Sequence, residues 1–187
     1  MMFNFSALTF ASRVRDWVSQ FLRKPDLRVL TFDAARDLRT WTLIDTGRIQ
    51  KAFTLEVRND EPEAAERCIA LINIRPAGAA MTDQWFVLHW AGLDYAFHTS
   101  GAQPVSIGAE GRRLDVLFTF HSQQQPGCWI ATPAALTAPL LTSDYLPPGE
   151  YDATIEIRAN NASTRQVHYR IVSPLKWTDL SAQPRAS

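Results

Sequence analysis

The spacing of hydrophobic residues changes near residue 25. Before this point, apolar residues recur every three or four positions: Phe3, Ala7, Phe10, Val14, Trp17 and Phe21, with Val18 and Leu22 widening the row. This spacing places them on one face of a helix, and Pro25 would end it. The sequence therefore predicts an amphipathic helix over residues 1–24.

From Leu27 onward the apolar residues follow a period of two, which is typical of strands. Segments that alternate apolar and polar residues, and so predict strands with one solvated face, are 53–58, 113–120, 151–158 and 167–171. Segments 68–74 and 85–90 are apolar on both faces, and shorter strands are expected at 27–32, 40–44 and 128–131. The alternation predicts a core made of Leu55, Val57, Ile72, Val87, Leu114, Val116, Phe118, Tyr151, Ile155 and Ile157.

Turn-forming residues separate these segments, as in Asn59-Asp60-Glu61-Pro62 and Pro147-Pro148-Gly149. Short strands without a helical crossover between them predict an antiparallel all-β domain. Two connections, 91–104 and 132–148, are longer than ordinary hairpin loops. We expect each to be either a Greek-key crossing or a functional loop.

One segment, Leu146-Pro147-Pro148-Gly149-Glu150-Tyr151, resembles a motif found in known β-sandwich folds. Followed by a strand, an Asn-rich turn and a second strand, it resembles the closing hairpin of immunoglobulin-like and fibronectin type III-like sandwiches. In those folds the tyrosine hydroxyl ties down the corner before the penultimate strand. The resemblance implies an immunoglobulin-like antiparallel β-sandwich of 7–9 strands over residues 25–173, preceded by the helix at 1–24 and followed by a tail at 174–187.

Composition narrows the class of protein. The chain has 187 residues, 46% of them apolar, and 19 basic residues balance 19 acidic ones. A chain of this size buries enough surface to fold as one domain, and its neutral charge argues against a nucleic-acid partner. Arginine and alanine are abundant, which is typical of a GC-rich bacterial genome. No apolar stretch is long enough to span a bilayer, and the N-terminus lacks the basic start of a signal peptide.

The cysteines Cys68 and Cys128 flank Trp85, at a spacing similar to that of antibody domains. Pro126 stands where such domains place their corner tyrosine, two residues before the second cysteine. We therefore expect both thiols to be unpaired, buried and poorly reactive.

No recognisable catalytic motif is present. The histidines His89, His98, His121 and His168 lack metal-ligand spacing, and nucleophile elbows and phosphate loops are missing. His89 lies in an apolar strand and is expected to be a hydrogen-bonded interior side chain. Arginines near the C-terminus alternate with acidic residues, which favours a salt-bridged surface over an anion-binding patch. We assign no catalytic residue, metal or cofactor.

The sequence offers two kinds of candidate binding surface. The helix face formed by Phe3, Phe10, Val14, Trp17, Val18 and Phe21 is too apolar to face water. Candidate loop contacts are Tyr95, Phe97, His98 and Tyr145. Two to four of the aromatics should be core residues, and any exposed cluster could hold a sugar ring or a partner side chain. This set comprises Trp41, Trp85, Trp90, Trp129, Trp177, Tyr95, Phe97 and Tyr145.

The sequence favours a non-catalytic interaction or adaptor domain that binds another protein, or a second copy of itself, through the helix and the long loops. The alternatives are a carbohydrate-binding module that uses exposed aromatics and, third, an enzyme of unrecognised type. We expect a cytoplasmic location, with peripheral membrane contact through the helix as the alternative.

Overall fold

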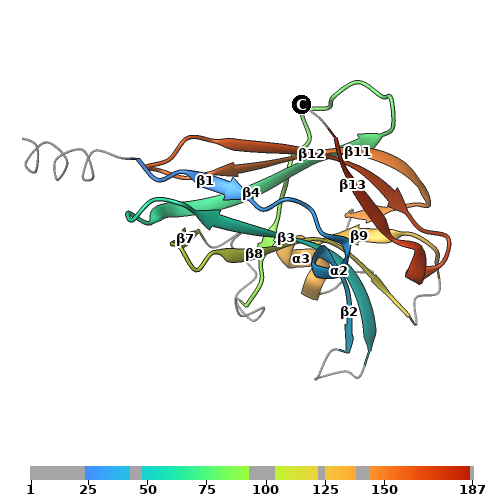
Figure 1. The fold of residues 1–187 in the computed structure, drawn as a ribbon. Helices are drawn as coiled ribbons and strands as arrows, with labels where there is room; N and C mark the ends of the chain where they lie inside the picture. The colour runs from blue at the N-terminus through green and yellow to red at the C-terminus, as the bar shows by residue number, and fades with distance from the viewer. Residues whose placement is uncertain (1–23, 43–47, 93–103, 122–124, 138–143, 186–187) are drawn as a thin grey trace, which may run out of the picture.

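A computed structural model of the chain (Figure 1) describes residues 24–42, 48–92, 104–121, 125–137 and 144–185. Within these ranges the chain forms two antiparallel sheets packed face to face, so the prediction of an all-β, sandwich-like fold is confirmed. The helix predicted at 1–24, with its stripe of Phe3, Phe10, Val14, Trp17, Val18 and Phe21, lies outside the described residues apart from Lys24. The loop contacts Tyr95, Phe97 and His98 also lie outside them.

The first sheet has the order β1 (Leu27–Val29), β3 (Ile49–Asn59), β8 (Arg112–Phe120), β9 (Cys128–Ile130) and β10 (Tyr145–Leu146). In addition, β2 (Leu38–Thr42) pairs with β3, and β6 (His89–Trp90) pairs with β8. The short helices α2 (Ala34–Asp37) and α3 (Pro133–Thr137) belong to connections of this layer. Asp33 begins α2 by accepting hydrogen bonds from the main-chain N–H groups of Ala35 and Arg36.

The second sheet has the order β13 (Ser181–Arg185), β12 (Arg165–Ser173), β11 (Gly149–Arg158), β4 (Ala65–Pro76) and β5 (Phe86–Val87), and β7 (Val105–Ile107) pairs with β4. The single-turn 3-10 helix η3 (Trp177–Asp179) links β12 to β13. Residues 174–187, set apart as a tail by the sequence pattern, thus contribute an edge strand through residues 181–185.

The main core lies between the two sheets, where alternate residues of each strand face inward. Tyr151, Ala153, Ile155 and Ile157 of β11 are buried there, as the period of two predicts. The predicted core residue Val87 is only half-buried, because β5 is a two-residue strand at the end of its sheet. The other nine predicted core residues are buried.

A β-bulge in β8 changes which residues share a face. Phe53 pairs with Leu117, but the next residue of β3, Thr54, pairs with Asp115, so Val116 has no direct partner. As a result Val116 and Leu117 both contribute to the main core, whereas Phe118 turns to the opposite face. The sequence pattern predicts that Leu114, Val116, Phe118 and Phe120 all face the same side of the sheet. Beyond the bulge this prediction is wrong, because Phe118 faces the other side.

Phe118 belongs to a second, smaller cluster on the outer face of the first sheet, which we call the outer cluster. Its buried members are Ala52, Phe118, Trp129, Ala131 and Ala135, with Trp41, Phe120, Leu136 and Tyr145 packed against them. Residues of α3 take part in this cluster, so both faces of the first sheet are apolar where α3 packs. Two tryptophans, Trp90 and Trp129, are fully buried.

Candidate functional site

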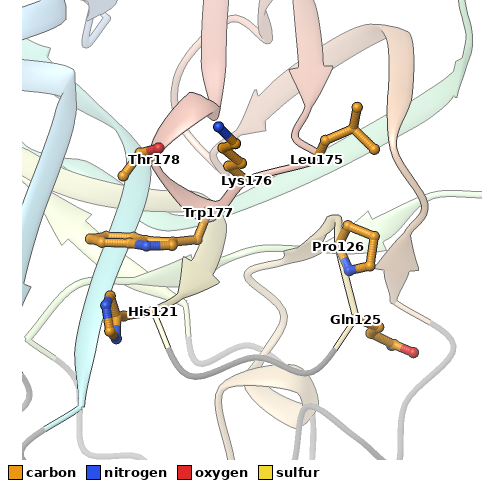
Figure 2. Close-up of a pocket in the computed structure, with 7 residues that line it drawn as sticks. All are labelled: His121, Gln125, Pro126, Leu175, Lys176, Trp177 and Thr178. Carbon is orange, nitrogen blue, oxygen red and sulfur yellow. The ribbon is translucent and has the colours of Figure 1, made fainter.

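A pocket of about 370 Å³ opens where the end of β8 meets the connection between β12 and β13 (Figure 2). Residues from connections of both sheets line it: His121, Gln125, Pro126, Leu175, Lys176, Trp177 and Thr178. We call this the Trp177 pocket. Its volume is at the small end of the range that protein ligand sites occupy, so it suits one ring or one large side chain.

Two hydrogen bonds between the sheets fix the wall formed by η3. Thr119 Oγ1 of β8 donates to the main-chain carbonyl of Trp177 at 3.0 Å. Lys51 Nζ of β3 donates to the carbonyl of Thr178. Burial lowers the pKa of Lys51, and the nearby Asp179 carboxylate partly opposes that shift. These bonds hold the second-sheet wall of the pocket on the first sheet, so the site is preorganised.

The wall itself is aromatic and its rim is apolar. The rings of His121 and Trp177 are 5.2 Å apart between centroids and inclined at 79°, an edge-to-face arrangement visible in Figure 2. Leu175 exposes 76% of its surface at the upper rim, across from Pro126. An exposed leucine beside an indole offers apolar contact area that an approaching molecule could cover.

The pocket contains few ionisable groups. Among the described residues that line it there is no carboxylate and no thiol, and its ionisable groups are Lys176 and His121. The Thr178 hydroxyl donates to Asp179 Oδ1 at 2.8 Å, so it is not paired with His121 as a nucleophile is with its base. The lining combines an indole, an imidazole, two apolar side chains, one ammonium, one amide and one hydroxyl.

Tyr145, a predicted loop contact, lies in strand β10. Its ring packs against Trp129 at 5.5 Å between centroids, and its hydroxyl donates to the carbonyl of Pro126. Tyr145 therefore helps to hold the turn that carries one wall of the Trp177 pocket. At the same turn Gly127 has φ +127°, and a Cβ there would lie 2.4 Å from the carbonyl oxygen of Leu146, so only glycine fits.

His89 is an interior side chain, as predicted. It is 3% exposed, and its Nδ1 lies 3.1 Å from Oδ2 of Asp115 on the neighbouring strand β8. His168 pairs instead with the Thr154 hydroxyl, at 3.1 Å from its Nδ1. In the described part of the chain, no three or more His, Cys, Asp or Glu side chains come together as metal ligands would.

Both cysteines are free and buried, so the predicted absence of a disulfide is confirmed. The Cys68 thiol donates to the carbonyl of Ala65 and the Cys128 thiol to the hydroxyl of Ser173, each at 3.4 Å. Burial raises the pKa of Cys68 to about 11 and that of Cys128 to about 12. Thiols in this state are protonated and weakly nucleophilic.

The arginines of the last hairpin are paired, as the alternation of charges predicted. Arg158 pairs with Glu156, and Arg165 with Asp26. Arg170 lies 3.1 Å from Glu150 and 3.3 Å from Asp152.

In the sequence, Trp177 is one of several aromatic residues and His121 is a loop histidine, and nothing in their spacing predicts that they lie together. They are far apart along the chain, and only the packing of η3 on the first sheet makes them neighbours. The lone apolar residue Leu175 after a strand was the one local signal for an exposed contact.

Within the described ranges no helix combines the length and apolar character needed to cross a membrane. Comparison with family models, with curated proteins and with solved structures found no match to this chain.

Proposed function

We propose that this protein is a non-catalytic binding domain that takes up a side chain of a protein partner in the Trp177 pocket. The observation that carries the proposal is the pocket itself, a preorganised cavity of about 370 Å³ between an indole and an exposed leucine. Tryptophan is one of the residue types enriched among the side chains that dominate binding energy at protein interfaces.

The lining also indicates what the partner presents. Trp177, Leu175 and Pro126 offer apolar surface, whereas Lys176 supplies a positive charge with no carboxylate beside it in the described lining. An apolar or aromatic side chain next to an acidic residue would match both features. The partner is therefore a protein segment that pairs a large apolar residue with Asp or Glu.

The amphipathic helix predicted over residues 1–24 provides the second contact in this proposal. Its apolar stripe needs a covering surface, and a partner or a second copy of the chain would supply one. The helix and the Trp177 pocket then act as two linked contacts, which raises the overall affinity above that of either alone.

The proposal includes an immunoglobulin-like type for the sandwich. The pairing order β1-β3-β8-β6 corresponds to strands A, B, E and D of that fold, and β12-β11-β4 corresponds to G, F and C. The β9–β10 pair is an addition to that plan. The hydrogen bond between Tyr151 and Pro147 at the start of β11 supports the same assignment.

Carbohydrate binding is the second candidate. It is favoured by the polar side chains of Gln125 and Thr178, which line the same pocket as the Trp177 ring, because a sugar needs both an aromatic face and hydrogen-bonding groups.

Matched surface variants test the proposal. Leu175 and Met81 are both exposed leucine-sized residues, at 76% and 55%, but only Leu175 lines the pocket. A partner captured from cells that express the protein, then purified, should bind Leu175→Asp at least about tenfold more weakly than wild type, and Met81→Asp equally well. Equal binding by all three proteins would rule out the pocket as the contact. Glycan-array binding that is lost only in Leu175→Asp would support the carbohydrate candidate instead.

A further inference from the structure

The outer face of the second sheet carries a set of polar residues that the Trp177 pocket does not use. Thr154, His168 and Arg185 are neighbours across strands β11, β12 and β13, and Arg75 of β4 is the cross-strand neighbour of Asp152. Cross-strand neighbours share a face, so these five side chains meet. They line a pocket of about 230 Å³, together with Ala153 and Tyr169.

The acidic residue in this pocket is already fully engaged. Asp152 is 8% exposed and accepts hydrogen bonds from the Gly78 N–H at 3.2 Å and from Arg185 Nη1 at 2.6 Å. Arg170 lies 3.3 Å from the same carboxylate. The Gly78 bond and these two guanidinium groups hold the pKa of Asp152 below its usual value, so it remains an anion that has no need of Arg75.

The guanidinium group of Arg75, in contrast, has no carboxylate partner among the described residues. Its Nε donates to the carbonyl of Ala79 at 2.9 Å, and its Nη1 is buried without a hydrogen-bond partner. Among the described residues no carboxylate lies within ion-pair distance of it. A buried guanidinium N–H without an acceptor is costly. The Arg75 side chain also lines the pocket, so an oxyanion bound there would give its guanidinium group an acceptor.

We propose that this pocket is a binding site for a small oxyanion, with Arg75 and Arg185 as the charged ligands and Thr154 and His168 as neighbouring polar contacts. Two guanidinium groups face one carboxylate in the lining, so the surplus charge is positive. The planar fork of a guanidinium matches the oxygens of a phosphate or a carboxylate group. The ligand class is therefore a small molecule that carries one of these two groups.

Titration of the full-length protein with inorganic phosphate and with acetate, at constant ionic strength, tests the site. We expect saturable binding of at least one anion with a dissociation constant no weaker than about 10 mM, accompanied by shifts of the His168 ring signals in NMR spectra. The ratio of the two affinities then tells phosphate chemistry from carboxylate chemistry. Absence of saturation by either anion, or saturation without any change at His168, would overturn the proposal.

Variants assign the binding to the pocket. Arg75→Gln should weaken anion binding about tenfold or more, because it removes the charge that has no partner. Arg28→Gln is the matched control, since Arg28 is an exposed arginine paired with Asp60 at 3.0 Å, away from the pocket. Should Arg75→Gln fail to fold, Arg185→Gln serves in its place. Equal weakening by the control and the pocket variant would show a general charge effect and refute the site.

Discussion

The hydroxyl of Tyr151 donates a hydrogen bond of 2.9 Å to the main-chain carbonyl of Pro147. This bond closes the corner at which the chain leaves the first sheet after Leu146 and enters the second sheet at Gly149. On the other side of the corner, Ser173 Oγ donates to the carbonyl of Leu146 at 2.9 Å. Burial raises the pKa of Tyr151, so the hydroxyl stays protonated and able to donate.

Replacing Tyr151 with Phe should lower the free energy of unfolding by about 1 kcal/mol, because the Pro147 carbonyl loses its donor while the ring remains. Tyr169→Phe is the control, since among the described residues the Tyr169 hydroxyl makes no hydrogen bond although its ring is buried. Urea unfolding measures both. A Tyr151 variant as stable as the control would mean that the corner bond contributes nothing.

Ile155→Ala should cost about 2–5 kcal/mol, because Ile155 is fully buried between the sheets and its truncation leaves a cavity. Val172→Ala, on the outer face of β12 and 36% exposed, should cost far less. Chemical denaturation of the two variants provides the comparison. Similar losses would place Ile155 outside the packed core.

The two thiols should react slowly with a thiol reagent at pH 8 in the folded protein, and two free thiols should be found in denaturant. Their buried positions keep them protonated and out of reach of the reagent. Rapid modification without unfolding would contradict their burial, and a count below two in denaturant would indicate a disulfide.

The same thiols predict a loss of stability at alkaline pH. In the unfolded chain they ionise near their ordinary pKa of 9.0, whereas in the folded protein they ionise at about 11 and about 12. Their contribution to stability is therefore complete below pH 9 and declines as the pH rises from 9 through 11 and 12. The double variant Cys68→Ala/Cys128→Ala should show a shallower decline between pH 9 and 11. An unchanged slope would mean that other groups cause the loss.

Thr119→Val should loosen the wall of the Trp177 pocket, because it removes the donor to the Trp177 carbonyl. We expect a loss of about 1 kcal/mol in stability and greater quenching of Trp177 fluorescence by acrylamide, measured against a Trp177→Phe reference. Thr54→Val is the matched control, since the buried Thr54 hydroxyl has no hydrogen-bond partner. If both variants behave alike, the inter-sheet bond does not position η3.

Deleting residues 1–24 should leave the β-domain folded while abolishing association with the partner or with a second copy. The reason is that the predicted helix face is an attachment surface in the proposed function. Melting temperature and native mass of the full-length and 25–187 proteins give the test. A large fall in melting temperature with unchanged monomeric mass would show that the helix covers the domain instead.

Strand positions were predictable from the sequence because alternation is a local property. In β11, Tyr151, Ala153, Ile155 and Ile157 face the core in the order that their spacing indicates. The corner at Pro147 and the unpaired cysteines were also predictable, the first from a motif and the second from the position of Pro126.

The phase of β8 could not be predicted, because a bulge depends on the partner strand. Nothing in the alternation of Leu114, Val116 and Phe118 reveals that Val116 is skipped in the pairing with β3. One extra residue reverses every later side chain, which sends Phe118 to the outer cluster.

The sequence by itself determined the all-β class, the inward residues of the regular strands and the interior character of His89, since each follows from residues close together in the chain. The tertiary structure alone decided that Ser181–Arg185 becomes a strand, because that segment has no strand pattern and pairs only where the edge of β12 is available. It also decided which residues form the Trp177 pocket and the pocket lined by Arg75. Each gathers side chains from distant segments, and their proximity depends on how the sheets pack and register rather than on any spacing along the chain.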